Sequence, residues 1–209
     1  TNLLSTLIKF VSVVLGTTLL HGVIVLPLIL YLTTGVSPLK FWLGAREALI
    51  TAFATSSSAA TMPITLRCAE QHLHVKREIA GFVIPIGTTM NMDGTALYEC
   101  VAVLFLAQLL GADLTIAQQL LVLFLALATS TGMAGIPAAS LVAIALILER
   151  VGLPAEALGL LLITDRPLDM CRTAVNVWSD SVAARLVAHY AKTDAPTLAK
   201  TRADEEPAQ

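Results

Sequence analysis

The sequence predicts an all-α membrane protein in which transmembrane helices and two re-entrant helical hairpins form an inverted repeat. Of its 209 residues, 56% are hydrophobic and only 13% are charged, whereas a soluble domain has about 25% charged residues. The uncharged runs 10–39 and 114–148 both exceed the ~20 residues that cross a bilayer. Short apolar arms also alternate with small polar segments, as in membrane helices that are interrupted. A soluble enzyme is therefore excluded.

The net charge of −2 comes without a dense basic tract, so nucleic acid is not expected as a partner. The three cysteines, Cys68, Cys100 and Cys171, are scattered through or beside apolar segments and suit neither a disulfide framework nor a metal site. The chain begins at Thr1 without a basic leader, and we expect it to be the later part of a longer protein.

Residues 1–40 predict a tilted transmembrane helix over about 3–34. His21 lies within this span, and an ionisable residue inside a membrane suggests a proton relay. Because the sequence shows no carboxylate partner for it, we interpret His21 as structural.

Residues 41–78 predict the first re-entrant hairpin. An apolar arm leads to a small polar tip at 56–63, and a second arm follows; each arm is too short to span a bilayer. Basic residues flank both ends of the segment: Lys40, Arg46, Arg67, Lys76 and Arg77. Both ends are therefore expected on the cytoplasmic side, so the segment must enter and return. The alternative is a surface helical hairpin with a serine-rich turn.

Residues 79–112 predict a transmembrane helix that is broken near its middle by the polar sequence 87–95. This break places the Asp93 carboxylate near the bilayer midplane. Residues 113–150 predict a second hairpin, with a tip of small residues at 130–140.

Residues 151–191 predict a polar transmembrane helix, and the segment 192–209, rich in charge, Ala and Pro, predicts a disordered tail. The order is thus hairpin, broken helix, hairpin, polar helix. In an inverted repeat of this kind, substrate and ions bind near the midplane where the helices are interrupted. The layout favours a secondary transporter.

Six polar residues of the last helix fall within one stripe of roughly 100°. They are Asp165, Asp169, Arg172, Thr173, Asn176 and Asp180. A charged group at the bilayer centre costs about 2.5 to 3.5 kcal/mol, so a stripe with three carboxylates and an arginine should face a ligand, ions or water. Internal salt bridges for packing alone are the weaker interpretation.

The charges indicate what fills such a site. Asp93, Asp169, Asp180 and Arg172 sum to −2, and an acidic amino acid adds −1, so cations must enter with it. The planar fork of Arg172 suits a side-chain carboxylate, and Asp169, one turn earlier, can receive an ammonium group. The amides of the hairpin tips and of Asn176 suit the other carboxylate.

A hard, oxygen-only set of ligands suits Na⁺ rather than a transition metal. The sequence offers such a set in the carbonyls of Gly87, Asn91 and Asn176 with the Asp180 carboxylate. We expect Na⁺ as the coupling ion and no other cofactor.

Four motifs carry a specific resemblance: Ser-Ser-Ser-Ala-Ala-Thr-Met-Pro at 56–63, Asn-Met-Asp-Gly-Thr-Ala at 91–96, Ala-Gly-Ile-Pro at 134–137 and Asp-Met-Cys-Arg-Thr-Ala-Val-Asn-Val at 169–177. In this order and spacing they resemble the dicarboxylate/amino acid:cation symporter family, the glutamate transporters. The resemblance extends over about 1–191 and implies that the chain starts at the family's sixth transmembrane helix. It further implies an elevator movement, a homotrimeric full-length parent, and a scaffold that lies outside this chain.

The resemblance also assigns residues. It implies that substrate is held by Ser58, Thr95, Ile136, Ser140, Asp169, Arg172, Thr173 and Asn176. It implies one Na⁺ at Gly87, Asn91, Asn176 and Asp180, and a second at Thr89, Ser130, Thr131 and Met133. A third Na⁺, near Asn91 and Asp93, would need further oxygens from a helix outside this chain.

The sequence departs from the family pattern at several positions. Some relatives carry an arginine where this chain has Ser56 or Met170, so Arg166 is the candidate for the balancing cation. Asp180 favours sodium, because proton-coupled members place asparagine there. Ser140 replaces a common glycine and could change the fit around the distal carboxylate.

The expected function is therefore sodium-coupled symport of aspartate or glutamate across a cell membrane, of the bacterial inner-membrane type, by a multi-pass protein that is not an enzyme. The alternative of the same class is a proton-coupled C4-dicarboxylate symporter, which would make little use of Asp169 as an ammonium partner. An ion channel is the alternative of a different class. A serine hydrolase is weaker still, because the serines at 56–58 have no histidine or lysine base within the motifs.

Overall fold

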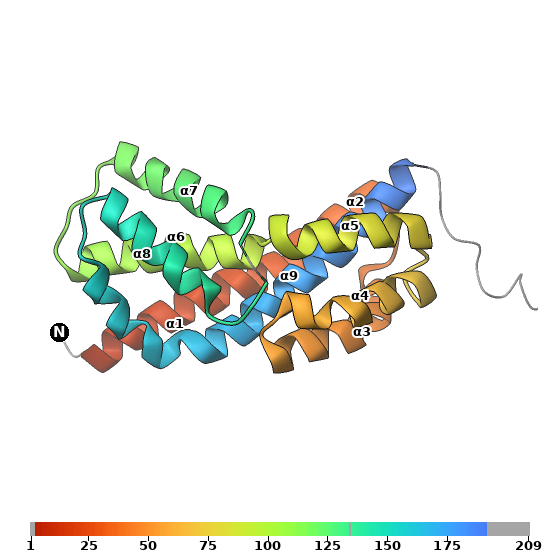
Figure 1. Cartoon of the computed structure of the whole chain (residues 1–209), viewed down its shortest axis with the longest axis horizontal. Helices are drawn as coiled ribbons and strands as arrows, with labels where there is room; N and C mark the ends of the chain where they lie inside the picture. The colour runs from red at the N-terminus through yellow and green to blue at the C-terminus, as the bar shows by residue number, and fades with distance from the viewer. Residues whose placement is uncertain (1–2, 134, 192–209) are drawn as a thin grey trace, which may run out of the picture.

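The computed structural model describes residues 3–133 and 135–191, and each regular element in these ranges is a helix (Figure 1). In chain order the elements are α1 (Leu3–Leu20), the π-helical turn η1 (His21–Val25), α2 (Leu26–Thr34), α3 (Pro38–Thr55), α4 (Ser58–Gln71), α5 (Arg77–Met90), α6 (Asp93–Leu109), α7 (Ile116–Ser130), α8 (Ala139–Arg150), the 3₁₀ turn η2 (Ala155–Leu160) and α9 (Leu162–Tyr190). The predicted all-α class is confirmed. The tail predicted at 192–209 lies outside the described residues.

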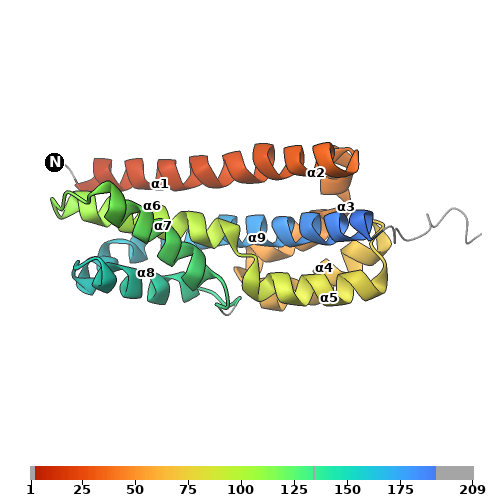
Figure 2. The same cartoon turned by 90° about the horizontal axis from the view of Figure 1, so that it is seen from above.

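Helix α9 is the axis of the molecule. Helices α3, α4 and α5 gather at one end of it, and α6, α7 and α8 gather at the other (Figure 1). The rod formed by α1, η1 and α2 runs along one side of both groups (Figure 2). Because α9 contacts elements of both groups, the polar stripe on its surface lies where they meet.

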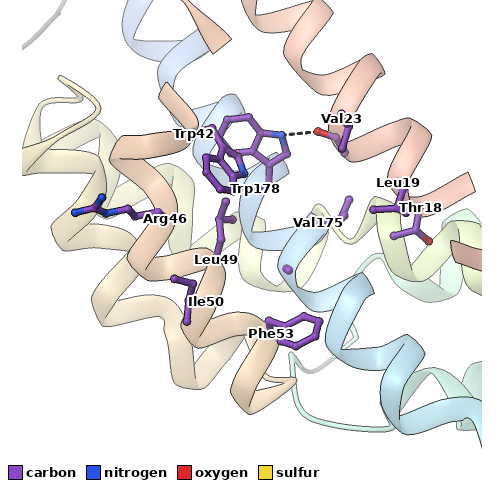
Figure 3. Close-up of a pocket in the computed structure, with 12 residues that line it drawn as sticks. Thr18, Leu19, Val23, Trp42, Arg46, Leu49, Ile50, Phe53, Val175 and Trp178 are labelled. Carbon is purple, nitrogen blue, oxygen red and sulfur yellow. Dashed lines mark hydrogen bonds between the residues drawn. The ribbon is translucent and has the colours of Figure 1, made fainter. Parts of the chain in front are cut away.

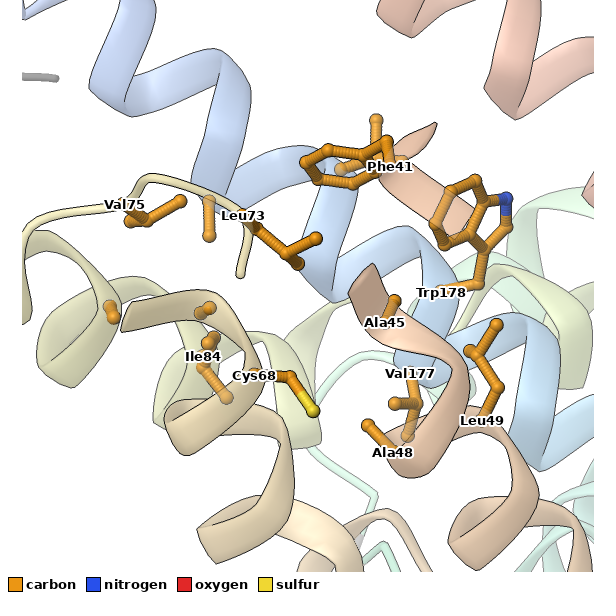
Figure 4. Close-up of a cluster of buried hydrophobic side chains, with 14 of the residues drawn as sticks. Phe41, Ala45, Ala48, Leu49, Cys68, Leu73, Val75, Ile84, Val177 and Trp178 are labelled. Atoms are coloured by element: carbon orange, nitrogen blue, oxygen red, sulfur yellow. The ribbon is translucent and has the colours of Figure 1, made fainter. Parts of the chain in front are cut away.

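Each end has its own apolar core. At one end, Phe41 of α3 and Trp178 of α9 lie 5.4 Å apart between ring centroids, and they pack with Leu73, Ile84 and other buried side chains (Figure 4). At the other end, Phe10 of α1 packs with buried residues of α6, α7 and α8. The polar groups between the two cores are therefore held by apolar packing on both sides.

Two helical hairpins point toward each other. The first, α3–α4, turns at Ser56, whose φ of 51° is left-handed, and Ser57 caps α4 by accepting a hydrogen bond from the Ala60 amide at 3.1 Å. The second, α7–α8, begins with a capping box between Thr115 and Gln118. We predicted a polar tip at 56–63, but α4 already begins at Ser58, because the Ser57 hydroxyl satisfies one of its first free amides.

The helix expected over 79–112 is interrupted at one point. Helix α5 ends at Met90 and α6 begins at Asp93, so the break is confined to Asn91 and Met92, within the predicted segment 87–95. The interruption leaves the side chains of Asn91 and Asp93 close to α9 and η1, respectively.

The rod contains a local change of helix type that its sequence explains. Pro27 has no amide hydrogen, so in the π-helical register the Gly22 carbonyl lacks its usual donor. The indole nitrogen of Trp178 donates to that carbonyl at 3.0 Å. A Cβ on Gly22 would lie 3.0 Å from Val175, so glycine allows this close approach to α9.

Within residues 3–133 and 135–191, two helical stretches are long and apolar enough to cross a membrane, Leu4–Thr34 and Arg77–Leu109. In the first stretch, only 22% of an 18-residue apolar segment is buried within the structure, whereas 56% of the corresponding segment of the second stretch is buried. The first stretch therefore presents most of its apolar surface outward.

Candidate functional site

The polar stripe of α9 is enclosed by the fold. All six of its members are buried: Asp165, Asp169, Arg172, Thr173, Asn176 and Asp180. Helix α9 is contacted by α1, α3, α4, α5 and α6, so the stripe faces neighbouring helices. Polar partners must therefore come from those helices or from a bound ligand.

Arg172 is the centre of the first part of the site. Its guanidinium group is 1% exposed and donates to Asp165 at 3.1 Å and to Asp169 at 2.9 Å. The same group donates to the Ser140 hydroxyl at 3.1 Å and lies 3.6 Å from the centre of the Tyr98 ring. Its Nε atom has no hydrogen-bond partner among the described residues, so this N–H is free to bond to a ligand.

Sequence reasoning missed part of this arrangement. Tyr98 donates from its hydroxyl to Asp165 at 3.0 Å, and a tyrosine in an apolar helix gave no signal of that role. Our charge sum also omitted Asp165, although it lies in the stripe. Arg166, the candidate balancing cation, is exposed and takes part in none of the ion pairs found in the described part of the chain.

Most of the residues that the resemblance implies for substrate binding line one polar cleft. Its predicted members are Ser58, Thr95, Ile136, Ser140, Asp169, Thr173 and Asn176. Arg172 reaches the same place through its bonds to Ser140 and Asp169. The cleft has a volume of only about 20 Å³, room for about one water molecule. An amino acid can enter only if the walls of the cleft move apart.

The two hairpin tips close over this cleft. The Gly135 carbonyl accepts hydrogen bonds from the Ser57 hydroxyl at 2.7 Å and from the Ala59 amide at 3.1 Å. The Ala138 amide donates to Asp169 at 3.2 Å. The Ser56 hydroxyl lines the cleft and is buried without a partner in the described residues, so it too can bond to a ligand.

The first predicted Na⁺ set is largely assembled. The Asn91 amide donates to Asp180 at 3.0 Å, and a Cβ on Gly87 would collide with the Asp180 carboxyl group. Asn176 points elsewhere, since its oxygen accepts from the Gly94 amide at 2.8 Å and its nitrogen donates to Thr95 at 2.9 Å. Three of the four predicted members thus meet, while the Asn176 side chain is bonded to α6.

The second predicted set lies where α5 meets the second tip. The Thr89 carbonyl accepts from the Gly132 amide at 2.6 Å. The hydroxyls of Ser130 and Thr131 both donate to the Leu127 carbonyl, and Met133 follows in the same loop. The structure therefore brings both segments together, with the Ser130 and Thr131 hydroxyls turned to the α7 backbone and the Thr89 hydroxyl turned to Ile86 of α5.

Asp93 of the third predicted set has a partner that we did not foresee. Its carboxyl oxygen lies 2.5 Å from Nε2 of His21, and its other oxygen accepts from the Gly94 amide at 3.0 Å. Our interpretation of His21 as lacking a carboxylate partner was wrong. The two residues are 72 positions apart, so no local sequence pattern could pair them.

Glu99 is a further buried carboxyl group that sequence reasoning passed over. It is fully buried, and one of its oxygens accepts from the Thr129 hydroxyl at 2.7 Å. The other oxygen has no partner among the described residues. An acidic residue inside an apolar helix is itself a signal of function, and that signal was available in the sequence.

Comparison with known proteins identifies the class. The profile of the sodium:dicarboxylate symporter family matches residues 1–190, and the chain belongs to this family. It is 46% identical over 188 residues to the human excitatory amino acid transporter 2, covering 90% of this chain and 33% of that protein.

Two further relatives agree. Mouse excitatory amino acid transporter 5 is 45% identical over 184 residues, which cover 88% of this chain and 33% of the relative. A Caenorhabditis elegans excitatory amino acid transporter is 44% identical over 188 residues, with coverages of 90% and 37%. The chain thus spans about a third of the length of these relatives.

Proposed function

We propose that this chain is the C-terminal core of a secondary active transporter that carries aspartate or glutamate together with Na⁺. The observation that carries the proposal is the buried Arg172 between two carboxyl groups, beneath two hairpin tips that share hydrogen bonds. The names of the relatives, which are excitatory amino acid transporters, support the same substrate class.

The substrate's side-chain carboxylate pairs with Arg172 in this proposal. To do so it takes the place of Asp165 on the guanidinium fork, with the unpartnered Nε as an additional donor. The ammonium group pairs with Asp169, and the other carboxylate meets the amides of the tips. Ser58, Thr95, Thr173 and Asn176 complete the polar wall, while Ile136 and Ser140 lie on the second tip and at the start of α8.

Sodium ions supply the positive charge that balances the carboxyl groups of the site and of the bound substrate. We propose Na⁺ at the carbonyls of Gly87, Asn91 and Asn176 and at the carboxylate of Asp180. A second Na⁺ binds Thr89, Ser130, Thr131 and Met133, and a third binds near Asn91 and Asp93. Because the Asp93 carboxyl is in contact with His21, binding there competes with that contact.

The hairpins act as gates in a multi-pass protein of the cell membrane. We propose transmembrane segments at 1–40, 79–112 and 151–191, and re-entrant hairpins at 41–78 and 113–150. The narrow cleft and the hydrogen bond that joins the tips through the Gly135 carbonyl support gates that are formed by the two tips. An elevator movement and a homotrimer belong to the full-length protein.

Transport by the full-length protein in proteoliposomes tests the proposal. Labelled aspartate should accumulate when an inward Na⁺ gradient is imposed and should not accumulate with a pH gradient alone. Accumulation driven only by the pH gradient, with preference for succinate, would establish the proton-coupled dicarboxylate symporter instead. Conductance with no uptake of aspartate would establish an ion channel.

Asp169→Asn separates amino acids from dicarboxylates. The change removes the proposed partner of the ammonium group, so aspartate binding should weaken far more than succinate binding. Equal losses for both ligands would show that Asp169 has only a structural role.

A further inference from the structure

An apolar groove lies on the outside of the molecule, away from the polar cleft. It has a volume of about 300 Å³ and is walled by α1 and η1, by α3 and by α9 (Figure 3). Along α3, the side chains of Trp42, Arg46, Ile50 and Phe53 follow one another down one wall. Trp178 forms the floor, with its indole nitrogen bonded to Gly22.

The groove follows α3 for about two helical turns from Arg46 to Phe53. These two residues are seven positions apart on the helix, which corresponds to a rise of about 10 Å. The hydrocarbon core of a bilayer is about 30 Å thick, so one leaflet is about 15 Å deep. The upper part of a single acyl chain that starts beside Arg46 can therefore lie in the groove as far as Phe53.

Arg46 joins this groove to a polar cavity. The same side chain lines a second hollow of about 510 Å³, whose other members include Gln71, His72 and His74. Arg46 is exposed, and it makes no ion pair within the described ranges 3–133 and 135–191. The neighbouring Glu47 is already paired with Arg67. The rim of an apolar groove thus carries an uncompensated cation.

We propose that an anionic phospholipid of the cytoplasmic leaflet binds here, with its phosphate at Arg46 and one acyl chain in the groove. Basic residues between membrane helices on the cytoplasmic side recognise acidic headgroups, and the positive flanks of this hairpin predict that side. Such a lipid combines a phosphate for Arg46, which also lines the polar cavity, with an acyl chain for the apolar lining of the groove.

The chain supplies its own probe, since both of its tryptophans, Trp42 and Trp178, line the groove. We would reconstitute the full chain in phosphatidylcholine vesicles and measure tryptophan quenching by brominated phosphatidylglycerol or brominated phosphatidylcholine. One basic residue near the membrane surface favours an acidic lipid about fivefold. Half-maximal quenching by the brominated phosphatidylglycerol should therefore need about one fifth of the mole fraction.

Arg46→Gln should abolish this preference and Arg46→Lys should retain most of it. Lys40→Gln is the matched control, because Lys40 is exposed at the same end and lines neither cavity. High salt should reduce the preference of the unaltered chain, a result that depends on no variant. Equal quenching by both lipids would overturn the proposal, and quenching by neither would show that another part of the protein or a second copy fills the groove.

Discussion

At the scale of single residues, Arg172 is distinguished by the number of its partners. Asp165, Asp169, Ser140 and the Tyr98 ring all contact its guanidinium group. A buried cation of this kind must stay paired, because an uncompensated charge is very costly. The two carboxyl groups therefore hold Arg172 in place, and in the proposed function a substrate carboxylate replaces Asp165 on its guanidinium group.

The fork geometry of Arg172 should matter more than its charge. Arg172→Lys retains the cation but loses the paired donors, so aspartate binding should weaken by about 2 kcal/mol or more, roughly 30-fold. Binding is measured by calorimetry on the full-length protein. Arg166→Lys, an exposed position on the same helix, is the matched control and should bind normally. Normal affinity in Arg172→Lys would show that the positive charge alone suffices and that the fork is not needed.

Glu99 invites a test of proton exchange. Glu99→Gln keeps an acceptor for the Thr129 hydroxyl but cannot gain or lose a proton. Since ionisable groups buried in membrane proteins commonly relay protons, we expect the pH dependence of aspartate uptake to become flatter in this variant. Uptake is measured at a series of pH values with a fixed Na⁺ gradient. An unchanged pH profile would mean that Glu99 only supports the packing of α6 against α7.

At the scale of helices, several of the candidate binding residues lie at or near the points where helices end. Ser56 and Ala138 both adopt left-handed backbone angles at hairpin tips, and Asn91 lies in the gap between α5 and α6. Backbone groups that are free at such ends are the ones that can bind ions and carboxylates. Where a helix is interrupted, its backbone N–H and C=O groups lose their partners within the helix. These groups can then bind ions or carboxylates.

Gly135→Ala should weaken the closed state of the tips. A Cβ there would lie 3.0 Å from the Thr88 carbonyl and 3.1 Å from the Ala59 amide. Overpacking of this kind costs about 1 to 3 kcal/mol, so aspartate affinity should fall by a corresponding factor. Gly159→Ala, where a Cβ meets nothing within 4 Å, is the control. Equal affinity in both variants would show that the contact between the tips does not limit binding.

Asp180→Asn should uncouple substrate from sodium. If Asp180 is a Na⁺ ligand, aspartate affinity at fixed Na⁺ falls and its dependence on Na⁺ concentration becomes shallower, because linkage is reciprocal. Titration of aspartate at several Na⁺ concentrations measures this slope. Asp113→Asn, in the exposed connection after α6, should leave it unchanged. A lower melting temperature with an unaltered slope would assign Asp180 to packing instead.

At the scale of the whole molecule, the apolar surface is arranged for a bilayer rather than for water. Exposed side chains such as Leu32 at 71% and Ile116 at 77% lie on the rod and on the second hairpin. Many other large apolar side chains of these segments are exposed as well, whereas soluble monomers rarely expose large apolar patches. The fold therefore needs lipid, or further parts of a longer protein, around it.

The chain should stay in the membrane when ionic contacts are removed. After expression, the full chain should remain in the pellet through an alkaline carbonate wash, since apolar burial does not depend on charge. Detergent should then release it. Recovery of the chain in the carbonate supernatant would contradict membrane integration of this segment.

The sequence predicted what depends on local pattern and missed what depends on distant contacts. The order of hairpins, the break near Asn91 and the polar stripe of α9 follow from composition and helical periodicity. The contact between His21 and Asp93 and the stacking of Tyr98 on Arg172 join positions 72 and 74 residues apart. No periodicity links such positions, so only the packed structure reveals them.

The π-helical turn of the rod holds one residue more than an α-helix would need between the same two ends. Removing one residue from His21–Val25 would let the rod continue as regular α-helix while the side chains on either side of the turn kept their directions, because a π-helical turn accommodates its extra residue within about the same rotation. Phe10 and Val14 would still face α6, and Leu26 and Leu30 would keep their places. A family member that is shorter by one residue here can therefore retain the packing of both halves of the rod, so a one-residue difference in length at this turn marks the loss of the π-helical turn rather than a change in what the rod contacts.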